Sequence, residues 1–327
     1  MVNIGPYLID PARLSLDWTG EALPLACIDL RHVAADQGEP RLPPFPVIGI
    51  GDRSHSYARS LDTVIEAPVT IERLIAQATR HPDAAAATVQ LLRCIDGLDI
   101  EPALTLESIC FAMLQASAGH RRWIAAQPRT EPAPPGSLRL SRDGATLRLV
   151  IDRPDARNAV DRRLRDALFE AFTIAALDPD ITRVEWRATG AAFGVGADLA
   201  EFGTTRDPAR AHGIRQRTLP ARPLARCGPI VDVHVQGGCV GSTLEMAAFA
   251  GRITAAPSAW FQLPELAMGI LPGAGGCVSV PRRIGRQRAA LMILSGKRID
   301  ATTALRWGLI DAIGDQPPVD PGGADAD

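Results

Sequence analysis

The sequence predicts an α/β fold in which strands and helices alternate in layers, preceded by a smaller, helix-rich region. Between residues 137 and 314, short apolar runs alternate with segments of helical periodicity, a rhythm typical of strands joined by crossover helices. Ahead of this part, Pro128–Ser137 holds four prolines in ten residues. Because neither a helix nor a central strand tolerates that density of proline, this stretch is predicted to connect two regions.

The chain is therefore divided at its proline-rich stretch. Residues 1–127 are predicted to form an α-rich region, 128–137 a linker, 138–314 the core and 315–327 a disordered tail. Within the first region, apolar runs predict two strands and helical periodicity predicts three helices. The predicted strands cover residues 25–30 and 46–51, and the predicted helices cover 71–80, 83–93 and 102–115. The last helix has an apolar face that needs a partner surface, made of Leu104, Leu106, Ile109, Met113 and Leu114.

The core begins with a predicted hairpin, whose strands are joined by the turn Arg142–Ala145. An amphipathic helix follows, with Leu164, Leu168 and Phe172 on one side. Two further strands each end in a glycine-rich turn, and residues 203–220 are interpreted as an arginine-rich loop. The predicted strands cover 138–141, 146–151, 183–188, 230–235 and 252–255, and the predicted helices cover 162–177, 244–251 and 266–270.

Composition excludes several classes of function. The chain is 46% apolar and 22% charged with a net charge of −2, so it lacks the basic field that binds nucleic acid or an anionic membrane. No apolar run is long enough to span a bilayer, and the N-terminus has no signal-peptide pattern. We therefore expect a cytoplasmic protein. The six cysteines form no Cys-x-x-Cys pair, and no metal site is predicted.

A first glycine-rich turn follows the strand over residues 183–188. Gly194 and Gly196 tolerate backbone angles that other residues resist, so the N–H of Ala197 could point into a cleft instead of into a sheet. Alone, the motif is equally well explained as a tight turn between a strand and a helix.

A second turn follows the strand over residues 230–235, and here Gly241 precedes a helix. Amides at the start of a helix lack intrahelical partners and carry positive dipole character, which makes the N–H of Ser242 a natural donor. Glu245 lies about one turn further on, and Glu265 follows a proline at another helix start. Either glutamate alone is also explained as a carboxylate that satisfies local amides.

Together these features predict chemistry on a carbonyl group. Two amides directed at one oxygen stabilise an enolate, and removing one such donor typically costs about 3 kcal/mol of barrier. An acyl thioester held there becomes acidic at its α-carbon, and a conjugated double bond becomes electrophilic at its β-carbon. Two carboxylates on one face then suit the addition of water, because one accepts a proton from water and the other protonates the α-carbon.

Residues 137–314 resemble the crotonase, or enoyl-CoA hydratase/isomerase, family. The resemblance rests on six motifs that occur in the family's order. They are Arg153–Val160, Ala192–Leu199, Val235–Glu245, Gln262–Leu266, Gly269–Gly276 and Ala304–Asp311.

The resemblance implies a β-β-α spiral core, a CoA thioester as substrate, and homotrimers or hexamers. By position it marks the amides of Ala197 and Ser242 as the oxyanion hole, Glu245 as the base that activates water and Glu265 as the acid/base at the α-carbon. Coenzyme A belongs to the substrate, and no other cofactor is implied. The substrate-binding residues that it marks are Arg157, Asp198, Leu199 and Gly241.

The sequence departs from the family's pattern in three places. Ser242 stands where the family usually has glycine, and Gly251 where it commonly has an acid. The family also continues for some fifty to seventy residues beyond the position of Asp311, as helices that cover the site and build the trimer. Residues 67–126, which include Glu107 and Ser108, resemble that missing end. We therefore expect them to dock where the usual C-terminal helices would lie.

The motifs leave more than one function open. Both glutamates together favour syn hydration of a 2-enoyl-CoA, because isomerases of the family often keep only the position of Glu265. Double-bond isomerisation and thioester hydrolysis reuse the same oxyanion hole. A non-catalytic subunit that binds acyl-CoA or supports assembly is the alternative of another class, to which Ser242 and the unusual N-terminal region point.

Overall fold

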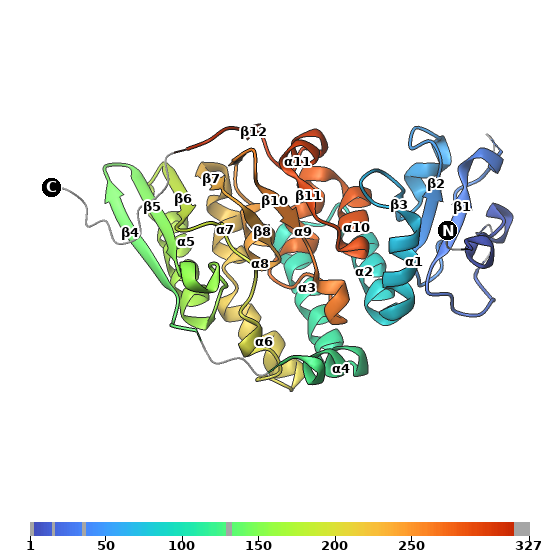
Figure 1. The fold of residues 1–327 in the computed structure, drawn as a ribbon, viewed down its shortest axis with the longest axis horizontal. Coiled ribbons are helices and arrows are strands. Elements are labelled where there is room, and N and C mark those ends of the chain that lie inside the picture. Colours follow the sequence, from blue (N-terminus) through green and yellow to red (C-terminus); the bar gives the residue numbers. More distant parts are fainter. Residues whose placement is uncertain (1–2, 15–16, 35–36, 129–132, 317–327) are drawn as a thin grey trace.

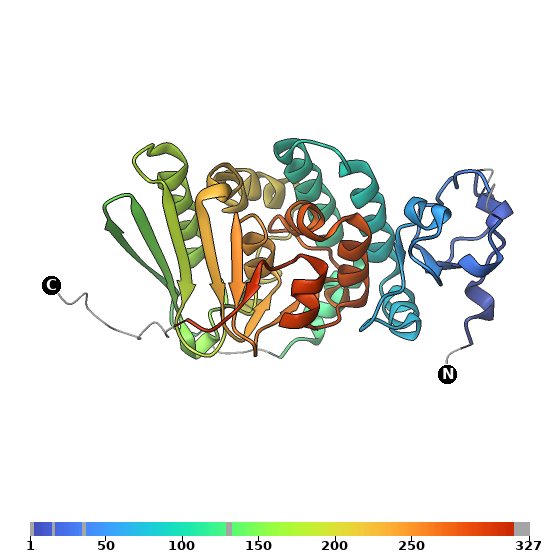
Figure 2. The same ribbon diagram turned by 90° about the horizontal axis from the view of Figure 1, so that it is seen from above.

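The computed structural model describes residues 3–14, 17–34, 37–128 and 133–316. These residues are arranged along one long axis, with a large sheet at one end, helices in the middle and a small sheet at the other end (Figure 1). Figure 2 shows that the helices of residues 71–126 pack against the core, whereas the small sheet lies beyond them. The described residues therefore form one continuous body, in which the small N-terminal sheet lies far from the large sheet of the core.

The large sheet has six strands in the order β12-β9-β7-β6-β5-β4. The hairpin strands β4 and β5 are antiparallel, and every other neighbouring pair is parallel. The strands are β4 (Ser137–Asp143), β5 (Thr146–Asp152), β6 (Arg183–Ala188), β7 (Val231–Val235), β9 (Arg252–Ala255) and β12 (Ala312–Ile313). The hairpin and the strands predicted from alternation are confirmed.

A second, three-stranded sheet has the order β11-β10-β8 and is made of β8 (Gly238–Val240), β10 (Trp260–Gln262) and β11 (Ile299–Asp300). The chain therefore passes from the large sheet into this second sheet of the core and back, which gives the core its β-β-α spiral. The core helices are α5 (Arg162–Leu177), α6 (Pro208–Thr218), α7 (Ala221–Cys227), α8 (Ser242–Ala247), α9 (Gly276–Ile284), α10 (Arg286–Ser295) and α11 (Ala301–Trp307). Short 3-10 helices cover η5 (Pro154–Ala156), η6 (Leu199–Glu201), η7 (Gly228–Ile230) and η8 (Glu265–Met268).

Three aromatic rings form the centre of the core beneath the first glycine-rich turn. Trp186 of β6 packs edge-on against Phe172 of α5 and against Phe193, with ring centroids 5.3 and 5.2 Å apart. All three side chains are fully buried. Because Phe193 immediately precedes Gly194, this packing fixes the point at which the turn leaves the core.

The N-terminal region combines strands with helices, and the two strands predicted over residues 25–30 and 46–51 are confirmed. Before Ile71 it forms a three-stranded parallel sheet, because the central residues of its first two strands are apolar and buried. The strands are β1 (Ala26–Asp29), β2 (Val47–Ile50) and β3 (Thr63–Val64), accompanied by η1 (Gly5–Tyr7), η2 (Pro11–Leu14), η3 (Leu30–His32) and η4 (Ser56–Ser60). The helices are α1 (Ile71–Arg80), α2 (Pro82–Ile95), α3 (Ile100–Gln115) and α4 (Ala118–Ala126).

The four N-terminal helices dock on the core through polar and apolar contacts. Arg73 of α1 donates to the carbonyl oxygen of Ser295 at the end of α10, at 2.6 Å. The ring of His120 in α4 hydrogen-bonds the carbonyl oxygen of Met268, at 2.8 Å. Phe111 of α3 is buried. That these helices occupy the place of the family's C-terminal helices stays a prediction.

Three sequence-based expectations need correction. Residues 203–220 contain helix α6, because Asp207 accepts from the N–H of Arg210 as an N-cap and is followed by proline. Helix α8 starts and ends earlier than predicted, since Gly241 at φ 51° turns the chain directly into it. The apolar face of α3 is split: Leu104 and Leu114 are buried, whereas Ile109 and Met113 are about half exposed.

The linker and the tail lie mostly outside the described residues. Residues 129–132 and 317–327 are not described, so the predicted disorder of 315–327 stays a prediction. The core begins one residue earlier than predicted, at Ser137 in β4.

Removal of residues 1–127 tests the dependence of the core on the N-terminal helices. We expect the remaining chain to be insoluble, or folded with an open site, because it exposes the apolar surfaces that α1–α4 cover. Soluble yield and size-exclusion chromatography measure this outcome. Co-expression of residues 1–127 as a separate chain is the control and should restore a soluble complex. A stable, fully active fragment would contradict the expectation.

Candidate active site

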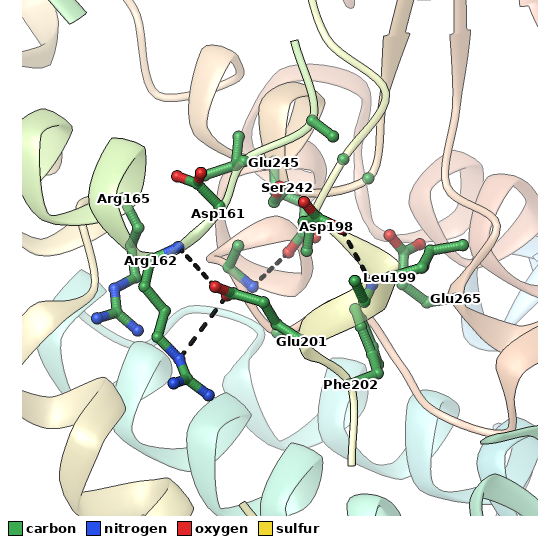
Figure 3. Close-up of a pocket in the computed structure, with 18 of the residues that line it drawn as sticks. Asp161, Arg162, Arg165, Asp198, Leu199, Glu201, Phe202, Ser242, Glu245 and Glu265 are labelled. Atoms are coloured by element: carbon green, nitrogen blue, oxygen red, sulfur yellow. Dashed lines mark hydrogen bonds and ion pairs between the residues drawn. The ribbon is translucent and has the colours of Figure 1, made fainter. Parts of the chain in front are cut away.

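The structure gathers all of the predicted site residues around one cleft of about 600 Å³. Figure 3 shows residues from the start of α5, from the turn that precedes α6 and from α8 facing this space. The predicted residues in its lining are Arg157, Ala197, Asp198, Leu199, Gly241, Ser242, Glu245 and Glu265. Sequence positions more than a hundred residues apart therefore meet at a single pocket.

The first glycine-rich turn is tied to the second by backbone hydrogen bonds. Gly194 donates to the carbonyl oxygen of Gly238 at 3.0 Å and accepts from the N–H of Val240 at 2.9 Å. The hydroxyl of Thr243 also donates to the carbonyl oxygen of Gly194, at 2.9 Å. A Cβ atom at position 194 would lie 2.4 Å from the Thr243 side chain, so only glycine allows this approach.

The amides of Ala197 and Ser242 both lie at these joined turns. Within the described ranges, neither N–H donates a hydrogen bond to a backbone or side-chain acceptor. A Cβ atom at Gly196, where φ is 94°, would lie 3.7 Å from the Ser242 nitrogen, which shows how closely the turns approach. Ser242 also leaves its buried hydroxyl oxygen without a partner among the described residues. The two amides are available to an acceptor that enters the cleft.

Glu245 projects from α8 and is almost fully buried. Its Oε2 accepts from the N–H groups of Ala274 and Gly276, at 2.6 and 3.0 Å. Burial raises the pKa of Glu245 to about 7, although these two amides and the charge of Arg215 oppose the rise. A carboxyl group in this position changes its protonation state near neutral pH.

Glu265 lies at the start of η8, on the other side of Gly241. A Cβ atom at Gly241 would lie 2.7 Å from its Oε1, so the missing side chain makes room for the carboxyl group. Its buried Oε2 has no hydrogen-bond partner among the described residues. Burial, and then the charge of Glu245, raise the pKa of Glu265 well above its ordinary value. Glu265 therefore tends to hold a proton where Glu245 tends to lose one.

A third buried carboxyl group comes from the N-terminal region. Glu107 of α3 accepts from the N–H of Gly275 at 2.7 Å and from the N–H of Cys277 at 2.8 Å. Burial, and then the charge of Glu245, raise the pKa of Glu107 well above its ordinary value. Glu107 and Glu245 thus bind alternate amides of the same turn. In the sequence, Glu107 is marked only by the resemblance of residues 67–126 to the family's C-terminal helices. The further sign of a functional role is an acid that lies among the apolar residues of a predicted helix.

Arg153 holds the end of the first glycine-rich turn. It is buried, and its Nη1 lies 2.8 Å from the Asp198 carboxylate, next to Ala197. Leu199, 48% exposed, offers an apolar surface on the cleft wall. Arg157 lies at the rim in a left-handed conformation with φ 51° and is exposed to solvent.

Two further features bear on the class of protein. In the described part of the chain, no group of three or more potential ligand side chains is arranged to hold a metal ion. Among the same residues, none of the helices combines the length and apolarity that crossing a bilayer requires.

Comparison with known proteins decides the family. The family model described as enoyl-CoA hydratase/isomerase matches residues 142–319, more than half of the chain. The chain belongs to this family. It is therefore an enzyme of the enoyl-CoA hydratase/isomerase type, and its core has the crotonase fold, as the sequence motifs predicted.

Curated relatives with related names match about half of the chain. The 2,3-dehydroadipyl-CoA hydratase of Escherichia coli K12 is 34% identical over 176 residues, which are 54% of this chain and 68% of the relative. The carnitinyl-CoA dehydratase of Salmonella arizonae is 32% identical over 189 residues, covering 54% of this chain and 67% of the relative. Both relatives are named for adding or removing water, which supports hydratase-type activity.

A solved structure agrees with the sequence matches. The crystal structure of an enoyl-CoA hydratase/isomerase from Mycobacterium abscessus aligns with a TM-score of 0.50 and 33% identity. The alignment covers 55% of this chain and 71% of that chain.

Substitution of Glu107 by glutamine tests its role at the turn. Glutamine keeps one acceptor but directs an NH₂ group at a buried N–H, so we expect a loss of about 1–3 kcal/mol in the free energy of unfolding. A drop in kcat that exceeds any change in KM should accompany it, because Glu245 shares this turn. Chemical denaturation and steady-state kinetics measure both quantities.

Asp99→Asn is the matched control for this substitution. Asp99 lies at the start of the same helix, and its side chain makes no capping hydrogen bond. The control should behave like the unchanged protein. Equal stability and equal kcat in Glu107→Gln would show that the turn does not depend on Glu107.

Proposed function

We propose that this protein adds water to a 2-enoyl-CoA thioester, with the amides of Ala197 and Ser242 as its oxyanion hole. The proposal rests above all on one observation: these two unpartnered amides lie on joined turns that border the same cleft as Glu245 and Glu265. The names of the relatives, which refer to hydration of dehydroadipyl-CoA and dehydration of carnitinyl-CoA, support the same reaction class.

The thioester carbonyl oxygen would accept hydrogen bonds from both amides. The negative charge that develops on this oxygen is then stabilised in a site whose donors are already oriented, which lowers the barrier most where charge appears. The Ser242 amide opens helix α8, so the positive end of the helix faces the same oxygen. The hydroxyl of Ser242, which lacks a partner, is available as a further donor.

Two carboxyl groups would move the protons. Glu245, as carboxylate, takes one proton from water while the water oxygen bonds to the β-carbon and the π bond breaks. The electron pair passes to the α-carbon and the thioester oxygen as an enolate. Glu265, as carboxylic acid, then protonates the α-carbon, and both additions occur on one face. The proton balance is restored when Glu245 returns its proton to Glu265 through solvent.

The protonation states favour this division of roles. Two backbone amides bind Glu245 and stabilise its charged form. Glu265 has an unpartnered buried oxygen and lies near the charge of Glu245, both of which favour its neutral form. A base and an acid are therefore placed together at neutral pH.

Isomerisation and thioester hydrolysis remain runner-up reactions, because they would use the same oxyanion hole. A non-catalytic binding subunit is disfavoured by the two buried carboxyl groups, since burial of unused acids costs free energy. We further propose that the enzyme needs no cofactor beyond the coenzyme A of its substrate, acts in the cytoplasm and forms trimers or hexamers. The half-exposed Ile109 and Met113 of α3 are candidates for contacts between subunits.

Replacement of Glu245 or Glu265 by glutamine should reduce hydration of crotonyl-CoA by at least about a hundredfold, because proton transfer by a positioned carboxyl group typically contributes that factor or more. Loss of the conjugated thioester absorbance measures the rate. The control is Glu201→Gln, which changes an acid at the rim of the same cleft. Full activity in either glutamine variant would refute the assigned roles.

The pH dependence of kcat/KM should have an acidic limb near pH 7. The base must be ionised, and burial raises the pKa of Glu245 to about 7, so activity should fall as the pH is lowered through that value. An alkaline limb should follow where Glu265 loses its proton, since its pKa is also raised. A rate that stays constant down to pH 5 would contradict the assignment of Glu245 as the base.

A further inference from the structure

One basic side chain in the cleft has no role in the reaction described above. Arg215 projects from α6, and its guanidinium carbon lies 3.8 Å from the centroid of the Phe111 ring. Its Nη2 donates to Oε1 of Gln115, at 3.3 Å. All three residues line the cleft. Helix α6 of the core and helix α3 of the N-terminal region therefore hold this cation between them.

Arg215 is a cation without a direct counter-ion. Among the described residues it forms no ion pair, and its buried Nη1 has no acceptor. Burial lowers the pKa of Arg215 to about 10, so it still carries its charge at neutral pH. A guanidinium removed from water without a paired anion destabilises the protein, and an oxyanion that enters the cleft would supply the missing partner.

The nearby glutamates do not supply that anion. Glu107 and Glu245 attract Arg215 at longer range, but both carboxyl groups are bound to backbone amides of the turn over residues 274–277. Neither makes a contact ion pair with the guanidinium. Their hydrogen bonds direct them toward the turn, and Nη1 of Arg215 is left without an acceptor among the described residues.

A second arginine increases the positive potential in this part of the cleft. Arg165 of α5 also lines the cleft, and its charge is close enough to Arg215 to lower the pKa of Arg215. Figure 3 shows Arg165 on the pocket wall beside Arg162. Arg165 pairs with Asp166 at 2.6 Å, so the unpaired charge is that of Arg215. Two like charges facing one cleft favour an anionic ligand.

Arg215 lies beyond the catalytic glutamate, on the side of the cleft formed by α3 and α6. Glu245 accepts a hydrogen bond from the N–H of Ala274. The preceding residue, Gly273, contacts Phe111 so closely that a Cβ atom at position 273 would overlap the ring. Arg215 covers that ring. An acyl chain whose thioester carbonyl meets Ser242 would pass Glu245 before its far end reaches Arg215.

We infer that Arg215 binds a carboxylate at the far end of the acyl chain, which makes the preferred substrate the CoA thioester of an unsaturated dicarboxylic acid. This inference rests on the proposed function for the location of the thioester. The ligand group is an oxyanion with two acceptor atoms, which a guanidinium binds more specifically than an ammonium group does. Phe111 and Gln115 orient the guanidinium toward it.

Binding of saturated thioesters tests the inference without requiring turnover. Adipyl-CoA and hexanoyl-CoA have equal chain lengths and differ in the terminal carboxylate, as do glutaryl-CoA and pentanoyl-CoA. In calorimetry with the full-length protein, we expect one diacid thioester to bind at least about tenfold more tightly than its matched partner. Arg215→Met should remove most of this preference, and Arg215→Lys should keep part of it.

Arg217→Met is the control, because Arg217 is an exposed arginine of the same helix outside the cleft lining. It should leave the preference unchanged. The inference is overturned if the unchanged protein has no preference, or if the preference survives in Arg215→Met. It is also overturned if Arg215→Met weakens the binding of free coenzyme A as much as the binding of the diacid thioester, because the anion bound by Arg215 would then be a phosphate of coenzyme A.

Turnover of the matching 2-enoyl thioesters separates this inference from the proposed function. If both enoyl thioesters are hydrated and only the diacid loses kcat/KM in Arg215→Met, both proposals are supported. If binding shows the preference but neither thioester is hydrated, only the hydratase proposal fails. An equal loss of kcat for both substrates would assign Arg215 to holding the charge of Glu245, which overturns the inference.

Discussion

The hydrogen bonds to four consecutive amides, from Ala274 to Cys277, connect the two parts of the molecule at the site. Glu245 of the core accepts from the first and third, and Glu107 of the N-terminal region accepts from the second and fourth. The turn leads directly into α9, so its amides form the positive end of that helix. Displacement of either carboxylate would leave buried donors without acceptors, and the orientation of the other would change with it.

Buried acids dominate the electrostatics of the cleft. Three carboxyl groups lie close enough for their charges to repel, and two of them, Glu107 and Glu245, each accept from two amides of the turn over residues 274–277. Glu265 is the exception, because its Oε2 has no partner among the described residues. Arg215 can still attract an added anion although acids lie nearby, because Glu107 and Glu245 accept from backbone amides and neither forms an ion pair with the guanidinium.

The local structure of the core follows from short-range signals in the sequence. Helix α5 has its predicted limits because Asp161 caps it, with Oδ1 accepting from the N–H of Leu164 at 2.8 Å. The meeting of Ala197, Ser242 and Glu245 at one cleft was predictable because each follows a strand in a glycine-rich turn. The family resemblance supplied the assignment of roles, which periodicity alone could not.

The residues that escaped prediction depend on contacts between distant segments. The role of Glu107 depends on a turn 168 residues later in the sequence, and no local pattern indicates that pairing. A loop over residues 203–220, which the sequence analysis predicts, gives Arg215 no fixed position, whereas Asp207 followed by proline starts helix α6 and places Arg215 in the cleft. The partial exposure of the apolar face of α3, at Ile109 and Met113, also depends on distant segments. Periodicity identifies the apolar side of a helix, but not how much of that side a neighbouring element covers.

The order of the segments along the chain has a consequence for synthesis on the ribosome. Helix α3 emerges well before the turn to which Glu107 binds, so its apolar side chains, Phe111 among them, remain without their partners while the core is still being made. Contacts of such long sequence separation form slowly. During that interval the nascent chain exposes apolar surface, which favours aggregation until α9 has been translated.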